Sequence, residues 1–202
     1  MLYSVLRKTV SPLIKWIYCM RIIGTEHIPE QGKLILCSNH RSVMDPIFLG
    51  VSVKKRQIHY MAKKELFSHH GKAVNKFLHA LGAFPVKRNS GDAQALKMAI
   101  AILEQGDLLG IFPQGGIVQN DIPFQPKSGV AMIAYHAKAS VMPISIYINE
   151  GMKLFHPVTI RFGKPIDYDT FGFTDGNRKE LRHASCMIAE RINQLLEEKN
   201  EY

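Results

Sequence analysis

The sequence predicts an α/β fold, in which a mixed, largely parallel sheet is flanked by helices and preceded by an N-terminal amphipathic helix. Short apolar runs typical of buried strands alternate with longer segments whose apolar residues recur at helical spacing, and this alternation indicates strand–helix–strand units. The length of 202 residues fits one domain with a small appendage and allows a sizeable core. A hydrophobic share of 46% and a charged share of 21% are ordinary for a globular protein.

The N-terminal segment, residues 2–20, is expected to form an amphipathic helix that breaks near Pro12, because proline interrupts helix hydrogen bonding. Its apolar residues are interspersed with three cations, and Trp16 and Tyr18 are side chains that suit a membrane interface. The segment is therefore either a membrane-associating helix or a terminal helix packed on the domain.

The remaining elements follow from local patterns. Short apolar runs predict strands at residues 33–38, 58–62, 84–87, 107–112, 141–148 and 157–162. Helical periodicity and start signals predict helices at residues 46–53, 72–81, 92–105, 128–138 and 177–198. The helix over 92–105 is the clearest, since Ser90 or Asp92 offers a cap and Gly106 an exit. A loop rich in Gly, Pro and Gln runs from Pro113 to Pro126.

Positive charge is concentrated in the first half of the chain. Residues 1–100 hold 16 Lys and Arg against 5 Asp and Glu, a balance of +11, whereas residues 101–202 hold 10 against 12, a balance of −2. Such a field attracts phosphate-bearing partners such as an anionic membrane surface or a phosphorylated small molecule. No nucleic-acid recognition motif accompanies the charge, so we expect no nucleic-acid partner. Basic residues at 54–56, 63–64, 72 and 76 are expected to form a solvated face.

The cysteines and apolar runs indicate a reducing compartment and no spanning helix. Cys19, Cys37 and Cys186 form neither a disulfide framework nor a metal-binding pattern. No apolar run approaches the roughly 18–20 residues that span a bilayer. The N-terminal apolar stretch contains cations, whereas the apolar region of a signal peptide is uncharged.

The spacing of His40 and Asp45, within Asn39-His40-Arg41-Ser42-Val43-Met44-Asp45, is the most informative pattern in the chain. If the segment turns into a helix between them, the carboxylate can hold one ring nitrogen and leave the other to accept a proton. The pair follows a buried strand and precedes a helix, a position where α/β proteins place their chemistry. We therefore expect His40 to act as a general base and Asp45 to orient it.

This block and the motifs that follow it resemble the 1-acylglycerol-3-phosphate acyltransferase family of glycerolipid acyltransferases. The resemblance runs from Gly24 to Gly163 in the family's order and spacing. It is carried by Gly24-x-Glu26-x-Ile28-Pro29, the Asn39-His40-x4-Asp45 block, Lys64-Glu65-Leu66, Gly82-Ala83-Phe84-Pro85-Val86-Lys87-Arg88, Phe112-Pro113-Gln114-Gly115, Phe124-Gln125-Pro126-Lys127-Ser128-Gly129 and Val141-Met142-Pro143-Ile144.

The resemblance implies that His40 takes a proton from the hydroxyl of a lysolipid, which then attacks the thioester of acyl-CoA or acyl-acyl carrier protein. It implies no acyl-enzyme, metal or cofactor. Backbone amides near Gly115 and Gly116 are candidate oxyanion donors. Arg88 and Lys127 stand where the family places positive charge for the acceptor phosphate, Gln114 is a candidate polar group in the acceptor pocket, and Asn39 is a candidate supporting residue.

The third motif departs from the family's Phe-Pro-Glu-Gly-Thr-Arg. The glutamate is replaced by Gln114 and the arginine, a candidate phosphate ligand, by Ile117, which cannot supply the planar fork of a guanidinium. Either Arg88 and Lys127 hold the phosphate without it, which we favour, or the acceptor has a different headgroup. A non-catalytic lipid-binding protein is a further alternative, against which the retention of His40 and Asp45 argues.

The predicted organisation is an N-terminal amphipathic, membrane-associating segment over residues 1–22 and an acyltransferase domain over residues 23–202. The protein is expected to lie peripherally on the cytoplasmic face of the cell membrane, without a spanning helix. Its expected partners are anionic lipids, a lysophospholipid acceptor and acyl-CoA or acyl carrier protein.

Overall fold

The structure, a computed structural model, describes residues 2–69, 71–87, 92–118, 124, 127–148 and 153–198, without the side chains of residues 2–9, 69, 72 and 73. One seven-stranded sheet organises the chain, with the strand order β1-β7-β6-β2-β5-β3-β4. The strands are β1 (Arg21–Ile23), β2 (Leu34–Ser38), β3 (Ile58–Lys63), β4 (Ala83–Val86), β5 (Leu108–Ile111), β6 (Ser140–Ile148) and β7 (Val158–Phe162). The predicted mixed, largely parallel α/β sheet is confirmed.

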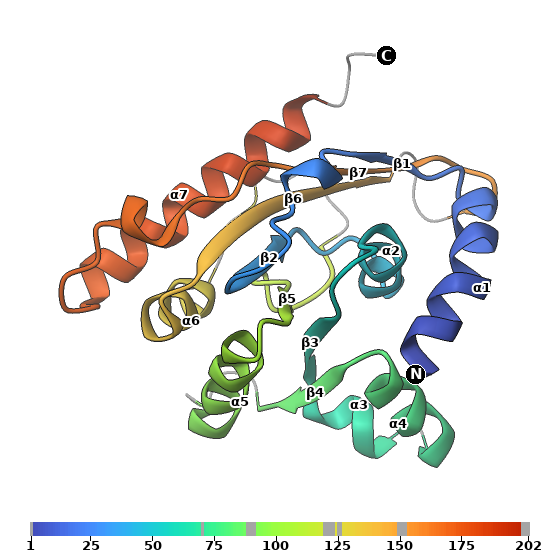
Figure 1. The fold of residues 1–202 in the computed structure, drawn as a ribbon, viewed down its shortest axis with the longest axis horizontal. Coiled ribbons are helices and arrows are strands. Elements are labelled where there is room, and N and C mark those ends of the chain that lie inside the picture. Colours follow the sequence, from blue (N-terminus) through green and yellow to red (C-terminus); the bar gives the residue numbers. More distant parts are fainter. Residues whose placement is uncertain are drawn as a thin grey trace.

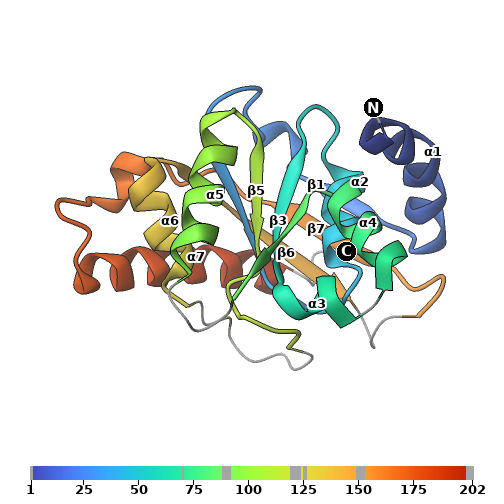
Figure 2. The ribbon, with the colours of Figure 1, turned by 90° about the horizontal axis from the view of Figure 1, so that it is seen from below.

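Helices cover both faces of this sheet (Figures 1 and 2). They are α1 (Leu2–Ile17), α2 (Asp45–Ser52), α3 (Lys64–His69), α4 (Gly71–Ala80), α5 (Ala93–Glu104), α6 (Gly129–Ala137) and α7 (Arg178–Glu197), with short 3-10 turns at η1 (Thr25–His27) and η2 (Tyr168–Phe171). In Figure 1, α5, α6 and α7 lie on one side of the sheet and α1 and α2 on the other.

The alternation of side chains along β2 divides the core into two layers. Ile35 and Cys37 face the cluster that contains residues of α5, α6 and α7. Leu34 and Leu36 face the cluster that contains residues of α2. Because successive side chains of a strand point to opposite faces, a continuous apolar run is required in a strand that is covered on both sides. All five residues of β2 are buried.

Strand direction sets the position of the site. Strands β6, β2, β5, β3 and β4 are parallel neighbours, so their carboxyl ends meet at one edge. Strand β7 runs antiparallel to β6, and β1 runs parallel to β7. The segments that follow β2 and β5, which contain His40 and Gln114, therefore emerge side by side at the same edge.

Two expectations about the N-terminal half are corrected, and two elements there are additional. Helix α1 does not break near Pro12 but runs through it. It packs on α2, and the Ser11 hydroxyl donates to Val51 O at 3.1 Å, so tertiary contacts hold the helix where one intrahelical hydrogen bond is missing. Strand β1 and helix α3 were not expected. Arg56 is not part of a solvated face: it is buried and donates to the carbonyl oxygens of Pro29, Gly32 and Gly106.

The division at residue 22 stays a prediction, and it falls inside β1, whose residues pair with β7. Within the described part of the chain, no helix combines the length and the apolar character that crossing a membrane requires.

Candidate active site

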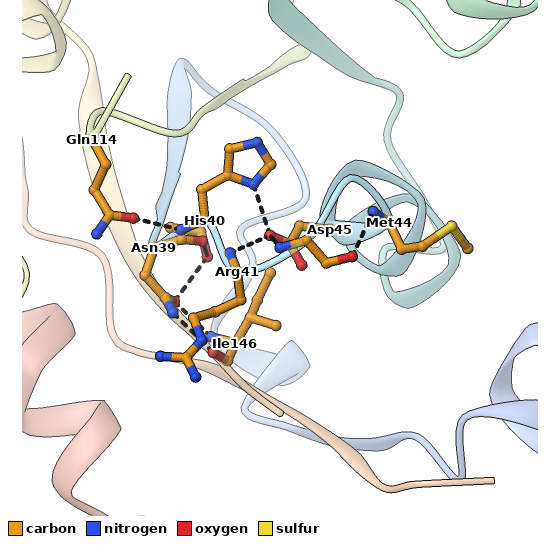
Figure 3. Close-up of polar contacts among 9 residues, drawn as sticks. Asn39, His40, Arg41, Met44, Asp45, Gln114 and Ile146 are labelled. Atoms are coloured by element: carbon orange, nitrogen blue, oxygen red, sulfur yellow. Dashed lines mark hydrogen bonds and ion pairs between the residues drawn. The ribbon is translucent and has the colours of Figure 1, made fainter. Parts of the chain in front are cut away.

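The His40 ring and the Asp45 carboxylate meet as their spacing predicted. Nδ1 of His40 lies 2.7 Å from Oδ2 of Asp45 (Figure 3). An ionised carboxylate can only accept, so in a neutral ring this contact places the proton on Nδ1 and leaves the lone pair on Nε2. In Figure 3 the second ring nitrogen points away from Asp45. The His40 side chain is 14% exposed and that of Asp45 is 0% exposed, so the pair lies just beneath the surface.

The turn between the two residues folds around the Asp45 carboxylate. Oδ2 also accepts the backbone N–H groups of Arg41 at 2.7 Å and of Ser42 at 2.8 Å. Asp45 is the first residue of α2, where the helix dipole favours a negative charge, and Pro46 stabilises the helix start. These three donors fix the carboxylate, and the carboxylate in turn fixes the ring.

The loop that follows β5 holds the backbone of His40. The side-chain oxygen of Gln114 accepts the His40 N–H at 2.7 Å, and the Val118 N–H donates to the His40 carbonyl at 2.8 Å. Both backbone groups of the histidine are therefore engaged by one loop. The structure brings Gln114 to the site, where its contact is with His40 itself; its place in the acceptor pocket stays a prediction.

The His40 imidazole packs on an aromatic ring, which in turn packs on a second one. The His40 ring stacks on Phe112, with centroids 4.4 Å apart and an interplanar angle of 24°. The Tyr60 ring lies parallel to Phe112 at 6.4 Å, and its hydroxyl donates to Pro46 O at 2.7 Å. Neither aromatic residue was assigned a role from the sequence. The position of Phe112 at the end of β5, beside the end of β2, was the signal that could have indicated its contact with His40.

Asn39 extends the pairing of β2 with β6. Its amide nitrogen donates to Ile146 O at 2.8 Å and its amide oxygen accepts Ile146 N–H at 2.7 Å. The residue is buried, so both bonds are protected from water. Asn39 thus fixes the chain immediately before His40, a geometry that suits the supporting role predicted for it.

Gly115 and Lys127 lie against each other at the edge of the site. Gly115 has φ +78°, a left-handed conformation that favours glycine, and a Cβ built on it would lie 2.9 Å from Nζ of Lys127. The Gly115 N–H donates to Phe112 O at 3.2 Å and so is already engaged. Around Gly116, a Cβ would meet no atom within 4 Å, so open space adjoins this residue.

An apolar cavity of about 210 Å³ adjoins Phe112, the ring on which His40 stacks. Phe112, Gly115, Lys87 and Lys127 line it together with apolar side chains from β3, α5 and α6. Asp92 also lines it, and hydrogen bonds from the backbone N–H groups of Lys87 and Ala95 lower the pKa of this carboxyl. The cavity combines an apolar wall with two lysines, a composition that suits a lipid with an anionic group.

Other features lie away from this centre. A larger cavity of about 1040 Å³ runs along α7 and has neither His40 nor Asp45 among its lining residues. Arg88, a predicted phosphate ligand, lies outside the described residues. Among the residues that are described, no three His, Cys, Asp or Glu side chains cluster as a metal site.

The fold and the site together define a class of protein. An orienting carboxylate, a histidine with one nitrogen available and an adjoining apolar cavity, at the carboxyl edge of a largely parallel sheet, are typical of an enzyme that uses a histidine as general base. Comparison with known proteins gives the family.

Residues 19–147 match the model of the protein family named Acyltransferase. A 1-acyl-sn-glycerol-3-phosphate acyltransferase of Bacillus subtilis is 31% identical over 179 residues, 87% of each chain. Another from Streptococcus pneumoniae is 35% identical over 149 residues, 71% of this chain and 54% of the relative. The crystal structure of the 1-acyl-sn-glycerophosphate (LPA) acyltransferase from Thermotoga maritima superimposes with a TM-score of 0.74 at 25% identity, covering 99% of this chain and 79% of that one.

The chain belongs to the acyltransferase family and is an O-acyltransferase. The resemblance inferred from the motifs is thereby confirmed, as is the fold. The roles of the individual site residues stay predictions.

Proposed function

We propose that the chain transfers a fatty acyl group from acyl-CoA or acyl-acyl carrier protein to the free hydroxyl of 1-acylglycerol-3-phosphate, giving phosphatidic acid for phospholipid synthesis. The observation that carries the proposal is the His40–Asp45 pair, joined at 2.7 Å beside an apolar cavity lined by Lys87 and Lys127. The names of the relatives from Bacillus subtilis and Streptococcus pneumoniae support this acceptor.

In the proposed reaction, Nε2 of His40 takes the hydroxyl proton as the oxygen attacks the thioester carbonyl. Asp45 stabilises the imidazolium that forms. The tetrahedral intermediate then expels the thiolate, the C–S bond breaks, and the thiolate takes the proton back from Nε2. The products are the acylated lipid and the free thiol, so His40 ends as it began.

The oxyanion of the intermediate requires a donor, because losing one costs an enzyme roughly 3–4 kcal/mol of transition-state stabilisation. We assign this role to the backbone N–H of Gly116, since that of Gly115 already donates to Phe112 O. Open space adjoins Gly116, which is what an approaching thioester needs.

Lys127 and Arg88 are proposed to hold the acceptor phosphate. The position of Lys127 supports this assignment, because its ammonium group lies against Gly115 at the edge of the cavity. A lysine binds phosphate as a point charge and needs no planar fork, so the reaction does not require an arginine at position 117.

The protein is further proposed to act at the cytoplasmic face of the cell membrane as a peripheral protein, bound to anionic lipids by α1 and basic residues. Leu13 and Trp16 of α1 are 54% and 67% exposed, and apolar side chains flanked by cations suit a bilayer interface.

The test is acyl transfer from acyl-CoA and from acyl-acyl carrier protein to lysophosphatidic acid on vesicles, measured for the parent, His40→Ala and His59→Ala. His59 is a matched control because its ring also contacts a carboxylate, Asp107, at 3.0 Å, but near the amino ends of β3 and β5. We expect activity in the parent and in His59→Ala, and loss of at least two orders of magnitude in His40→Ala. Equal activity of His40→Ala and the parent would remove His40 as the base.

A second candidate is acylation of a lysolipid with a different headgroup. It is favoured by Ile117, which stands where the family has arginine and is 42% exposed. Acceptors with and without a terminal phosphomonoester, assayed side by side, separate the two. Preference for the phosphomonoester supports lysophosphatidic acid, and preference for the other acceptor supports the second candidate.

A further inference from the structure

Three large apolar side chains near the end of α1 are exposed, outside the hydrophobic core. Trp16 at the end of α1 is 67% exposed, and Leu154 and Phe155, between β6 and β7, are 63% and 58% exposed. The rings of Trp16 and Phe155 pack edge to face, with centroids 5.5 Å apart. We call these three residues the aromatic wedge. Large apolar side chains that gather in solvent indicate a surface that meets a partner.

The wedge is held in place by its backbone. Phe155 N–H donates to Ile17 O at 2.8 Å, and Val158 N–H donates to Tyr18 O at 3.1 Å. Phe155 has φ +63°, a left-handed conformation that is unfavourable for a bulky residue and persists only where the surroundings impose it. The chain thus holds an exposed phenylalanine in a strained conformation against the end of α1, which argues against an incidental loop position.

Two lysines flank the wedge along the chain. Lys15 precedes Trp16, and partial burial together with the nearby charge of Lys54 lowers the pKa of the Lys15 ammonium group. Lys153 precedes Leu154. Anionic headgroups would relieve the repulsion between Lys15 and Lys54, so the charge is complementary to a bilayer that contains acidic lipids. Tryptophan and phenylalanine flanked by lysine suit the interfacial layer of such a bilayer.

The topology places the wedge at the edge of the sheet that carries the site. Strand β6 runs parallel to β2 and β7 runs antiparallel to β6, so residues 153–157, which precede β7, lie toward the edge where His40 follows β2. Figure 2 shows the segment just before β7 and the end of α1 toward the same lower edge as α3, which follows β3. A surface bound by the wedge would therefore meet the site edge of the molecule.

We propose that the aromatic wedge inserts into the interfacial layer of an acidic phospholipid bilayer and turns the site edge toward lipid acceptors in that bilayer. This inference rests on the proposed function for its lipid acceptor, and it adds a second contact element, Leu154 and Phe155, to the N-terminal helix.

The test uses the full chain, in which Trp16 is the one tryptophan of the sequence, so its fluorescence reports on the wedge directly. Vesicles of phosphatidylcholine and phosphatidylglycerol are expected to shift the emission to shorter wavelength, and lipids brominated near the headgroup are expected to quench it. Leu154→Ser and Phe155→Ser should each weaken vesicle binding by roughly tenfold, since each removes an apolar side chain that the bilayer would bury. Met98→Ser, in a side chain that is 41% exposed on α5, should leave binding unchanged.

Two further measurements separate folding and activity from docking. Thermal unfolding followed by circular dichroism checks that each variant is folded. If Phe155→Ser does not fold, Leu154→Ser alone carries the test. Acyl transfer to a short-chain lysolipid in free solution should be equal in the parent and both wedge variants, while transfer on vesicles should fall in the variants.

The outcomes for function and docking are distinguishable. Quenching of Trp16 without any acyl transfer would sustain the docking surface and refute the proposed function. Acyl transfer with unshifted, unquenched Trp16 emission on vesicles, or vesicle binding unchanged in both wedge variants, would overturn the wedge.

Discussion

Removing the side-chain oxygen of Gln114 is expected to slow acyl transfer without weakening substrate binding. That oxygen accepts the backbone N–H of His40 at 2.7 Å, and Gln114→Leu keeps the side-chain bulk while deleting the acceptor. A partly buried donor that loses its partner costs about 1–2 kcal/mol. When this cost is added to the activation free energy, kcat falls roughly 5- to 30-fold, because 1.36 kcal/mol corresponds to a tenfold change in rate.

The assay is steady-state release of the donor thiol with the lysolipid acceptor varied, which separates kcat from KM. Gln114→Glu retains an acceptor oxygen of the same reach and should retain most of the activity. Gln105→Leu, an exposed residue at the end of α5, controls for the loss of an amide elsewhere. A raised KM with unchanged kcat in Gln114→Leu would refute the reasoning, since it would make Gln114 a contact of the acceptor and not of the base.

Three other variants test what holds the site and the sheet. Asn39→Ala should destabilise the protein by about 2–4 kcal/mol in urea unfolding, because both buried hydrogen bonds to Ile146 are lost; unchanged stability would contradict their proposed importance. Arg56→Met should cost a similar ~2–4 kcal/mol because three backbone carbonyls lose their donor, whereas Lys55→Met, with a side chain 75% exposed, should cost little. Backbone hydrogen bonds lower the pKa of Asp92, so the stability that it adds is present above its usual value of 3.8 and is lost as pH falls through the lower folded-state value. Melting curves of Asp92→Ala and the parent should therefore differ at pH 7 and converge in acid; a difference that persists in acid would contradict the charge-based explanation.

Local sequence patterns were sufficient for most of the fold. A buried strand such as β2 has to be apolar on both faces, and an amphipathic helix such as α5 repeats its apolar residues every turn, so both leave strong signals. Strand β1 has only three residues, with the burial pattern exposed, intermediate, exposed, and its strand character comes from pairing with β7. The continuity of α1 through Pro12 likewise depends on α2, which packs against it.

The site divides in the same way between short-range and long-range contacts. His40 and Asp45 are five residues apart, and their contact is set by one turn, so the spacing alone predicted it. The hydrogen bonds of His40 to Gln114 and of Asn39 to Ile146 join residues 74 and 107 positions apart. Residue type indicates that an amide needs partners, but only the sheet order determines which backbone groups it meets.

The same contacts explain how this chain can depart from the family's third motif and still hold His40 in place. The loop after β5 holds His40 through the side-chain oxygen of Gln114 and the backbone N–H of Val118. Neither contact requires the negative charge of a glutamate or the guanidinium of an arginine. The Ile117 side chain, in contrast, is 42% exposed and makes no contribution to these bonds. The replacements at positions 114 and 117 therefore leave the positioning of the histidine intact, so any effect of Ile117 should fall on recognition of the acceptor headgroup. Such an effect would appear as a change in KM among acceptors, with the proton transfer at His40 unaltered.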